Sequence, residues 1–196
     1  LELRKQHQFA VIEMGANHVG EIDYLSNIAK PDVALVNNVG PAHLEGFGSL
    51  QNIAKTKAEI YNGLIDNGVA IINLDDEFSV FWQDYCSALP AIGKVITFSM
   101  QDKAADVFAK YIAKGCYQIN VQGEQADVTL KVPGVHNMMN ALAASSATYA
   151  LGVPLLSIVA SLSAFKNIKG RLTATTSALG YQVIDDTYNA NPLSVS

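Results

Sequence analysis

Short apolar runs alternate with helix-forming segments through the first half of the chain, and this alternation restricts the fold more than any other feature. Four runs are predicted to be buried strands: 9–13, 32–36, 69–74 and 94–98. Three intervening segments have a helical spacing of apolar residues: 22–30, 50–65 and 78–89. Strands that alternate with helices are joined by crossovers, which makes the strands parallel and places the helices on the sheet faces. The sequence therefore predicts an α/β fold with a mostly parallel sheet flanked by helices.

The second half of the chain adds a small antiparallel region. Two strand pairs are predicted around glycine turns: 117–121 with 126–132, and 172–176 with 181–185. Two helices are predicted between these pairs: 136–151 and 155–165. Residues 141–165 carry no charge, a stretch long enough for a membrane helix, but Gly152 and Pro154 interrupt it. We therefore expect two buried helices joined by a turn, and no membrane span.

Charge and cysteine content limit the partners and the compartment. The formal net charge of -5 argues against a broad electrostatic contact with nucleic acid, although a local phosphate site remains compatible with it. Cys86 and Cys116 form no CxxC pair and indicate neither a zinc site nor a disulfide framework. We expect a cytoplasmic monomer without a nucleic-acid partner.

Glu13 stands at the end of the first predicted strand, directly before Met14-Gly15. Ligands of open α/β sheets bind at the carboxyl ends of the strands. A carboxylate in this position can hold Mg²⁺, which takes oxygen ligands and completes its shell with phosphates and waters. The structural alternative is a hydrogen-bonded carboxylate at the end of a buried strand.

The loop 37–48 follows the second predicted strand and contains three glycines and one proline. Glycines let a backbone approach a ligand closely. His43 in this loop is a candidate metal or phosphate ligand, and the alternative is a solvent-facing polar group. Gly46-Phe47-Gly48 resembles the start of a dinucleotide fingerprint, but Gln51 replaces its third glycine, so this interpretation is weak.

Lys55 and Lys57 are two positions apart on a predicted helix and therefore point to nearly opposite sides. One of them must face inward or sideways, and the small residues Ala54 and Ala58 leave room beside Lys57. A partly buried lysine has a lowered pKa and becomes a nucleophilic neutral amine. The structural alternative is a basic surface face.

His136, Asn137 and Asn140 share one side of the start of a predicted helix. An amide offers a donor beside an acceptor, the pattern that pairs with the edge of adenine. The alternative is helix capping with a polar face. Near the end of the chain, Arg171 suits a phosphate and Asp186 suits a ribose, or Asp186 caps a turn.

Six ordered segments resemble the Mur ligases, the ATP-dependent amide ligases of cell-wall precursor synthesis. They are EMGANHVGEI, NNVGPAHLEGFGS, AKTKAEIY, GVHNMMNALAA, GRL and DDTYNANP. Three of them, EMGANH, GPAHLEGFGS and YNANP, are similar to the branch of the family that adds D-alanyl-D-alanine. The resemblance extends from Glu13 to Pro192, which is nearly the whole chain.

The resemblance implies a P-loop-type central domain for residues 1–188, without its phosphate-loop portion, and the start of a Rossmann-like domain at 189–196. It implies catalytic, Mg²⁺-holding roles for Glu13, His43 and Lys57, with Lys57 carbamylated by carbon dioxide. It also implies nucleotide contacts from His136, Asn137, Asn140, Arg171 and Asp186. The carbamate has a physical reason, because a lysine cation repels a metal ion and a carbamate anion attracts it.

The implied reaction uses small-molecule substrates. ATP phosphorylates the terminal carboxylate of a UDP-muramoyl tripeptide, and the amine of D-alanyl-D-alanine then displaces phosphate from the acyl phosphate. The chain contains no GxxxxGK[ST] segment, which predicts that residues 1–196 alone do not turn over ATP.

Two other interpretations remain open. A related ligase, such as a folylpolyglutamate synthase or another Mur branch, would share Glu13, His43 and Lys57 but would lack the EMGANH and YNANP segments. A non-catalytic nucleotide-binding module would explain the absent phosphate loop, but it would not need metal-ligating residues.

Overall fold

The computed structural model describes residues 3–40, 44–132, 134–166 and 173–185. The chain divides into two compact units. The first unit comprises the described residues of 1–72 and 76–95, and the second comprises those of 73–75 and 96–196.

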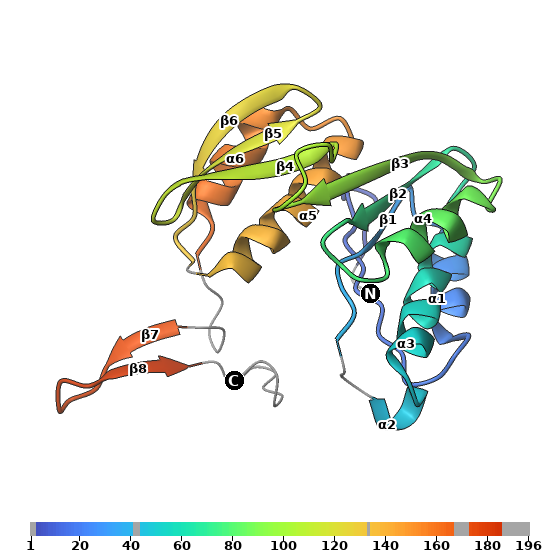
Figure 1. Cartoon of the computed structure of the whole chain (residues 1–196), viewed down its shortest axis with the longest axis horizontal. Helices are drawn as coiled ribbons and strands as arrows, with labels where there is room; N and C mark the ends of the chain where they lie inside the picture. The colour runs from blue at the N-terminus through green and yellow to red at the C-terminus, as the bar shows by residue number, and fades with distance from the viewer. Residues whose placement is uncertain (1–2, 41–43, 133, 167–172, 186–196) are drawn as a thin grey trace. The chain divides into compact units, whose positions relative to one another are not determined.

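The main sheet has six strands in chain order (Figure 1). They are β1 (Val33–Val36), β2 (Gly68–Asn73), β3 (Ile92–Ser99), β4 (Val107–Ala113), β5 (Cys116–Val121) and β6 (Glu124–Thr129). β1 pairs in parallel with β2, and β3 pairs in parallel with β4. β5 pairs antiparallel with both β4 and β6. This arrangement confirms the predicted α/β class, with a mostly parallel sheet and an added antiparallel region.

The helices of the first unit cover the three predicted helical segments, with one short addition inside the predicted loop 37–48 (Figure 1). They are α1 (Glu21–Ala29), α2 (Leu44–Phe47), α3 (Leu50–Ala58), the 3-10 helix η1 (Glu59–Gly63) and α4 (Ser79–Ser87). The hydroxyl of Ser49 accepts the backbone N–H of Asn52 at 3.2 Å, which begins α3 as a side-chain cap. α3 passes directly into η1, so the single helix predicted over 50–65 is two helices of different type joined end to end.

Trp82 lies fully buried in the apolar core of the first unit. Its indole N–H donates to the carbonyl of Ala54 at 3.1 Å, and its ring centroid lies 6.5 Å from that of Phe78. Tyr61 is also fully buried and donates its hydroxyl to the carbonyl of Ile71 at 2.9 Å. The buried members of this core are Ala34, Val36, Ala54, Ala58, Tyr61, Leu64, Ala70, Ile72, Trp82 and Cys86.

Two further helices belong to the second unit, α5 (Val135–Ala150) and α6 (Leu155–Ala164). α5 packs against β4, α6 packs against β6, and the two helices pack against each other. A separate antiparallel pair consists of β7 (Thr173–Thr176) and β8 (Gln182–Asp185). These elements confirm both predicted strand pairs and both predicted helices of the second half.

The charge-free stretch 141–165 is divided by a tight turn, as predicted. Gly152 has a φ of 80° and donates its N–H to the carbonyl of Tyr149 at 2.9 Å, closing α5 before Pro154 precedes α6. None of the helices in the described ranges combines the length and the apolar character that crossing a bilayer requires. Cys86 is a buried free thiol, and Cys116 is a half-buried one.

Residues 9–13 do not form the buried strand that their apolar run predicts. Phe9 is 61% exposed and Val11 is 100% exposed, and no ladder joins this segment to the sheet. An apolar run becomes a strand only where a neighbouring strand supplies hydrogen-bond partners, and β1 forms the edge of the six-stranded sheet without one from 9–13. The prediction of a strand ending at Glu13 was therefore wrong.

Candidate active site

The carboxyl ends of β1 and β2 meet at one edge of the sheet, because the strands are parallel and Val36 pairs with Ile72. Asp76 follows β2, and its side chain connects the segment after β1 with the segment after β2. Its carboxylate accepts the backbone N–H of Val39 at 2.7 Å with one oxygen and that of Phe78 at 2.9 Å with the other. Asp76 thereby ties the loop after β1 to the start of α4.

Asp76 was not predicted as a site residue. A usable pattern was present, because Asp75 and Asp76 directly follow the predicted strand 69–74. The same reasoning that selected Glu13, a carboxylate at the end of a strand, applies to Asp76. The sequence did not indicate that this carboxylate contacts the backbone of the loop after β1, which lies 37 positions earlier.

Lys57 lies in the last turn of α3, between Thr56 and Ala58, which are both buried. Its own side chain is half-buried, whereas Lys55 is exposed. The two lysines therefore differ in environment, as their spacing predicts.

Burial lowers the pKa of Lys57, because desolvation disfavours the ammonium form. The nearby charge of Asp76 acts in the opposite direction and raises the pKa, but by less than burial lowers it. The neutral amine is consequently populated at a lower pH than in an exposed lysine. A neutral amine is nucleophilic and can add carbon dioxide, so this environment is suited to the implied carbamate.

Glu13 is exposed, and no hydrogen bond or ion pair joins it to Lys57 within the described residues. His43 lies outside the described residues, as do Arg171 and Asp186. Among the residues that the structure does describe, no group of three histidine, cysteine, aspartate or glutamate side chains forms a metal-binding cluster. The convergence of Glu13, His43 and Lys57 stays a prediction.

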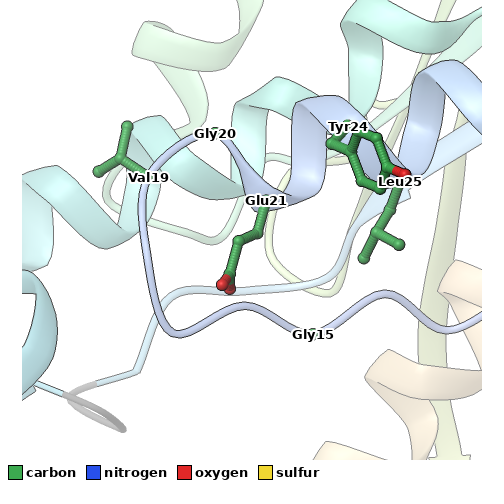
Figure 2. Close-up of a pocket in the computed structure, with 6 residues that line it drawn as sticks. All are labelled: Gly15, Val19, Gly20, Glu21, Tyr24 and Leu25. Carbon is green, nitrogen blue, oxygen red and sulfur yellow. The ribbon is translucent and has the colours of Figure 1, made fainter.

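The loop between Glu13 and α1 closes on the carboxylate of Glu21, in the first turn of the helix (Figure 2). This carboxylate accepts the backbone N–H of Asn17 at 2.7 Å and that of His18 at 3.2 Å. The imidazole Nδ1 of His18 lies 3.1 Å from the second carboxylate oxygen. The bond from Asn17 is the main cause of the lowered pKa of Glu21, and the contacts of His18 add to it. An open pocket borders the loop, lined by Gly15, Val19, Gly20, Glu21, Tyr24 and Leu25.

A second carboxylate reaches the same loop from η1. Glu59 accepts the backbone N–H of Gly20 with both oxygens, at 2.9 and 3.0 Å, and that of Asp23 at 3.3 Å. Gly20 is the N-cap of α1 and has no side chain that could cap the helix. Glu59 supplies the missing cap from a position 39 residues further along the chain.

The predicted adenine-contacting residues lie at the start of α5, in the second unit. His136 and Asn140 are exposed and Asn137 is half-buried. Gly134, the N-cap, has a φ of 105° and gives α5 no side-chain cap. Asn137 donates its backbone N–H to the carbonyl of Gly134 at 3.1 Å.

Residues 1–148 match the model of the Mur ligase middle domain. The chain is 40% identical over 195 residues to the UDP-N-acetylmuramoyl-tripeptide–D-alanyl-D-alanine ligase of Escherichia coli strain K12, a match that covers 97% of this chain and 42% of that protein. It is 41% identical over 192 residues to the ligase of the same name from Haemophilus influenzae, covering 97% of this chain and 41% of that protein. The chain thus spans about two fifths of the length of these relatives.

Solved structures of MurF ligases also resemble this chain over most of its length. A crystal structure of MurF from Acinetobacter baumannii has a TM-score of 0.90 and 40% identity, covering 99% of this chain and 42% of that one. The MurF ligase from Thermotoga maritima, solved in complex with ADP, has a TM-score of 0.70 and 28% identity, covering 91% of this chain and 40% of that one.

Proposed function

Because this chain belongs to the Mur ligase family through its middle domain, we propose that it forms the ATP-handling part of a cytoplasmic ligase that joins D-alanyl-D-alanine to a UDP-muramoyl tripeptide. Residues 1–188 are then the greater part of the central domain. The observation that carries the proposal is the 40% identity, over 97% of the chain, to a ligase named for this reaction. The half-buried Lys57, with its lowered pKa, supports it chemically.

In this function, the terminal carboxylate of the tripeptide takes the γ-phosphoryl group of ATP, and ADP leaves. The amine of D-alanyl-D-alanine then attacks the acyl carbon, the C–O bond to phosphate breaks, and an amide and inorganic phosphate result. Burial lowers the pKa of Lys57 and so increases the fraction of neutral amine that can add carbon dioxide. Asp76 holds the loop after β1 through Val39 and places a negative charge near Lys57.

We propose that Glu13, His43 and carbamylated Lys57 hold Mg²⁺. Carboxylate and carbamate oxygens are suitable ligands for this hard cation, and the reduced proton affinity of Lys57 favours the carbamate over the ammonium. The metal, when bound, would neutralise phosphate charge during transfer. The charge reversal at Lys57 is the contribution of this chain to that step.

Product analysis with a panel of amines tests the proposed function. The complete ligase is incubated with ATP, Mg²⁺, UDP-muramoyl tripeptide and either D-alanyl-D-alanine or glutamate, and the products are identified by mass spectrometry. We expect the pentapeptide product and one ADP for each amide formed, with D-alanyl-D-alanine alone. Omitting ATP provides the control. Amide formation with glutamate, or ATP cleavage without an amide product, would contradict the proposed substrate.

We further propose that Asn137 and Asn140, with His136 beside them, contact adenine. Asn140→Ala in the complete ligase should raise the KM for ATP about fivefold, because one hydrogen-bonded contact is worth roughly 1 kcal/mol. The control is Thr148→Ala, two turns further along α5, where the hydroxyl bonds to the carbonyls of Ala144 and Ser145 in its own helix. An unchanged affinity of the Asn140 variant for ATP in calorimetry would remove adenine from this position.

A further inference from the structure

The backbone between Lys57 and Glu59 is helical without interruption. α3 ends at Ala58 and Glu59 continues in right-handed helical conformation, with a φ of -55° and a ψ of -21°. Its backbone N–H donates to the carbonyls of Thr56 and Lys57. No flexible connection therefore separates the half-buried amine from this carboxylate.

The backbone that carries Glu59 is also held closely against α1. A Cβ atom at Gly63 would collide with the backbone of Ser26, so η1 and α1 meet backbone to backbone. The hydroxyl of Ser26 donates to the carbonyl of Glu59 at 3.3 Å. The amide of Asn62 donates to the carboxylate of Asp23 at 2.6 Å. The backbone contact at Gly63 and the bond from Ser26 fix the position from which the Glu59 side chain reaches the loop, whereas the Asn62 bond stabilises the α1–η1 contact beside it.

Hydrogen bonds connect the loop held by Glu59 to α1, the helix that follows it. The carboxylate of Glu21 accepts the backbone N–H groups of Asn17 and His18 inside the bend that Figure 2 shows. The carboxylate of Glu59 accepts the backbone N–H of Gly20 at the end of the bend. Glu13 precedes Asn17 by four positions. Glu21 thus holds the loop to α1, and Glu59 holds the start of α1 to η1, which continues the helix that carries Lys57.

We propose that Glu59 is a positioning residue that sets the loop following Glu13 relative to Lys57, and thereby the spacing of the two groups that would hold Mg²⁺. This inference rests on the proposed function, since it assigns Glu59 a task in the same site. A cap alone would stabilise α1 by about 1 kcal/mol and leave the affinity for Mg²⁺ unchanged. A positioning role affects both, because groups that orient metal ligands typically contribute about 10–100-fold to metal affinity or activity.

Substitution of Glu59 in the complete ligase separates these roles. Glu59→Ala should raise the Mg²⁺ concentration for half-maximal ligation at least about tenfold and lower kcat, with a smaller effect on the KM for the dipeptide. Glu59→Gln keeps the length and one acceptor oxygen, so it should fall between wild type and Glu59→Ala. Hydrogen exchange at the amides of Gly20 and Asp23 should accelerate in Glu59→Ala, a readout that requires no activity.

The matched control is Asn62→Ala, which removes the 2.6 Å bond to Asp23 and the 2.8 Å bond that Asn62 accepts from the hydroxyl of Tyr85, and leaves the loop amides bonded. It should lower Tm and keep the Mg²⁺ requirement within about twofold of wild type. The positioning role is overturned if Glu59→Ala behaves like Asn62→Ala, or if its Gly20 and Asp23 amides exchange as in wild type. A wild-type ligase that shows no Mg²⁺-dependent ligation would instead overturn the proposed function, before any substitution is made.

Discussion

Lys57→Arg should lower the kcat of the complete ligase about 10³-fold, the size of effect that loss of a preorganised charge contact produces. The guanidinium stays protonated and cannot add carbon dioxide, so a fixed positive charge replaces the proposed carbamate. The affinity for ATP should change much less, because the proposed adenine contacts lie on α5. The measurement is the steady-state rate of pentapeptide formation at saturating substrates.

Lys55→Arg is the matched control, since Lys55 is an exposed lysine on the same helix. It should retain full activity. The carbamate itself can be followed by NMR after incubation with ¹³C-labelled bicarbonate. Because burial lowers the pKa of Lys57, the signal should appear at a pH at which an exposed lysine is still protonated, and it should weaken as pH falls and the amine is protonated. Full activity of Lys57→Arg would refute the catalytic role of this residue.

Trp82→Ala should destabilise the first unit by about 3–5 kcal/mol, the cost of removing a fully buried aromatic side chain from a core. The indole is 0% exposed, packs near Phe78 and donates to the carbonyl of Ala54, a hydrogen bond that the substitution removes. Such a loss is a large part of the ~5–15 kcal/mol by which folded domains are typically stable. Urea unfolding followed by far-ultraviolet circular dichroism measures it.

Trp82→Phe provides the comparison, because it keeps an aromatic ring and removes only the hydrogen bond and part of the volume. Its cost should be clearly smaller than that of Trp82→Ala. Equal midpoints for Trp82→Ala and wild type would show that this side chain does not anchor the core.

The regular elements could be predicted because their patterns are local. Helix α1, strands β1 and β2 and the β5–β6 hairpin follow from apolar spacing, turn glycines and Pro31 within a few residues of each boundary. β4 was not predicted, because only its first three residues alternate between buried and half-buried, and the strand is exposed from Lys110 onward. The run 9–13 was misassigned because apolar spacing does not reveal whether a partner strand lies beside it.

The candidate site was predictable only where a residue acts through its own chemistry and local environment. Lys57 could be selected because two lysines two positions apart cannot share one helix face. Asp76 and Glu59 contact backbone amides 37 and 39 positions away, and no local pattern reports such contacts. Their carboxylates are anchored by tertiary packing, so they became recognisable only in the folded chain.

The absence of a side chain at Gly63 has a consequence for how this part of the molecule can vary. Helices usually keep their separation through side chains that can be exchanged for others of similar volume. Here the two main chains touch directly at Ser26, so even one added carbon would push them apart. Variation in this region must therefore arise around a spacer of fixed size, in the loop and at the helix surfaces, and any library built on this chain should keep position 63 invariant.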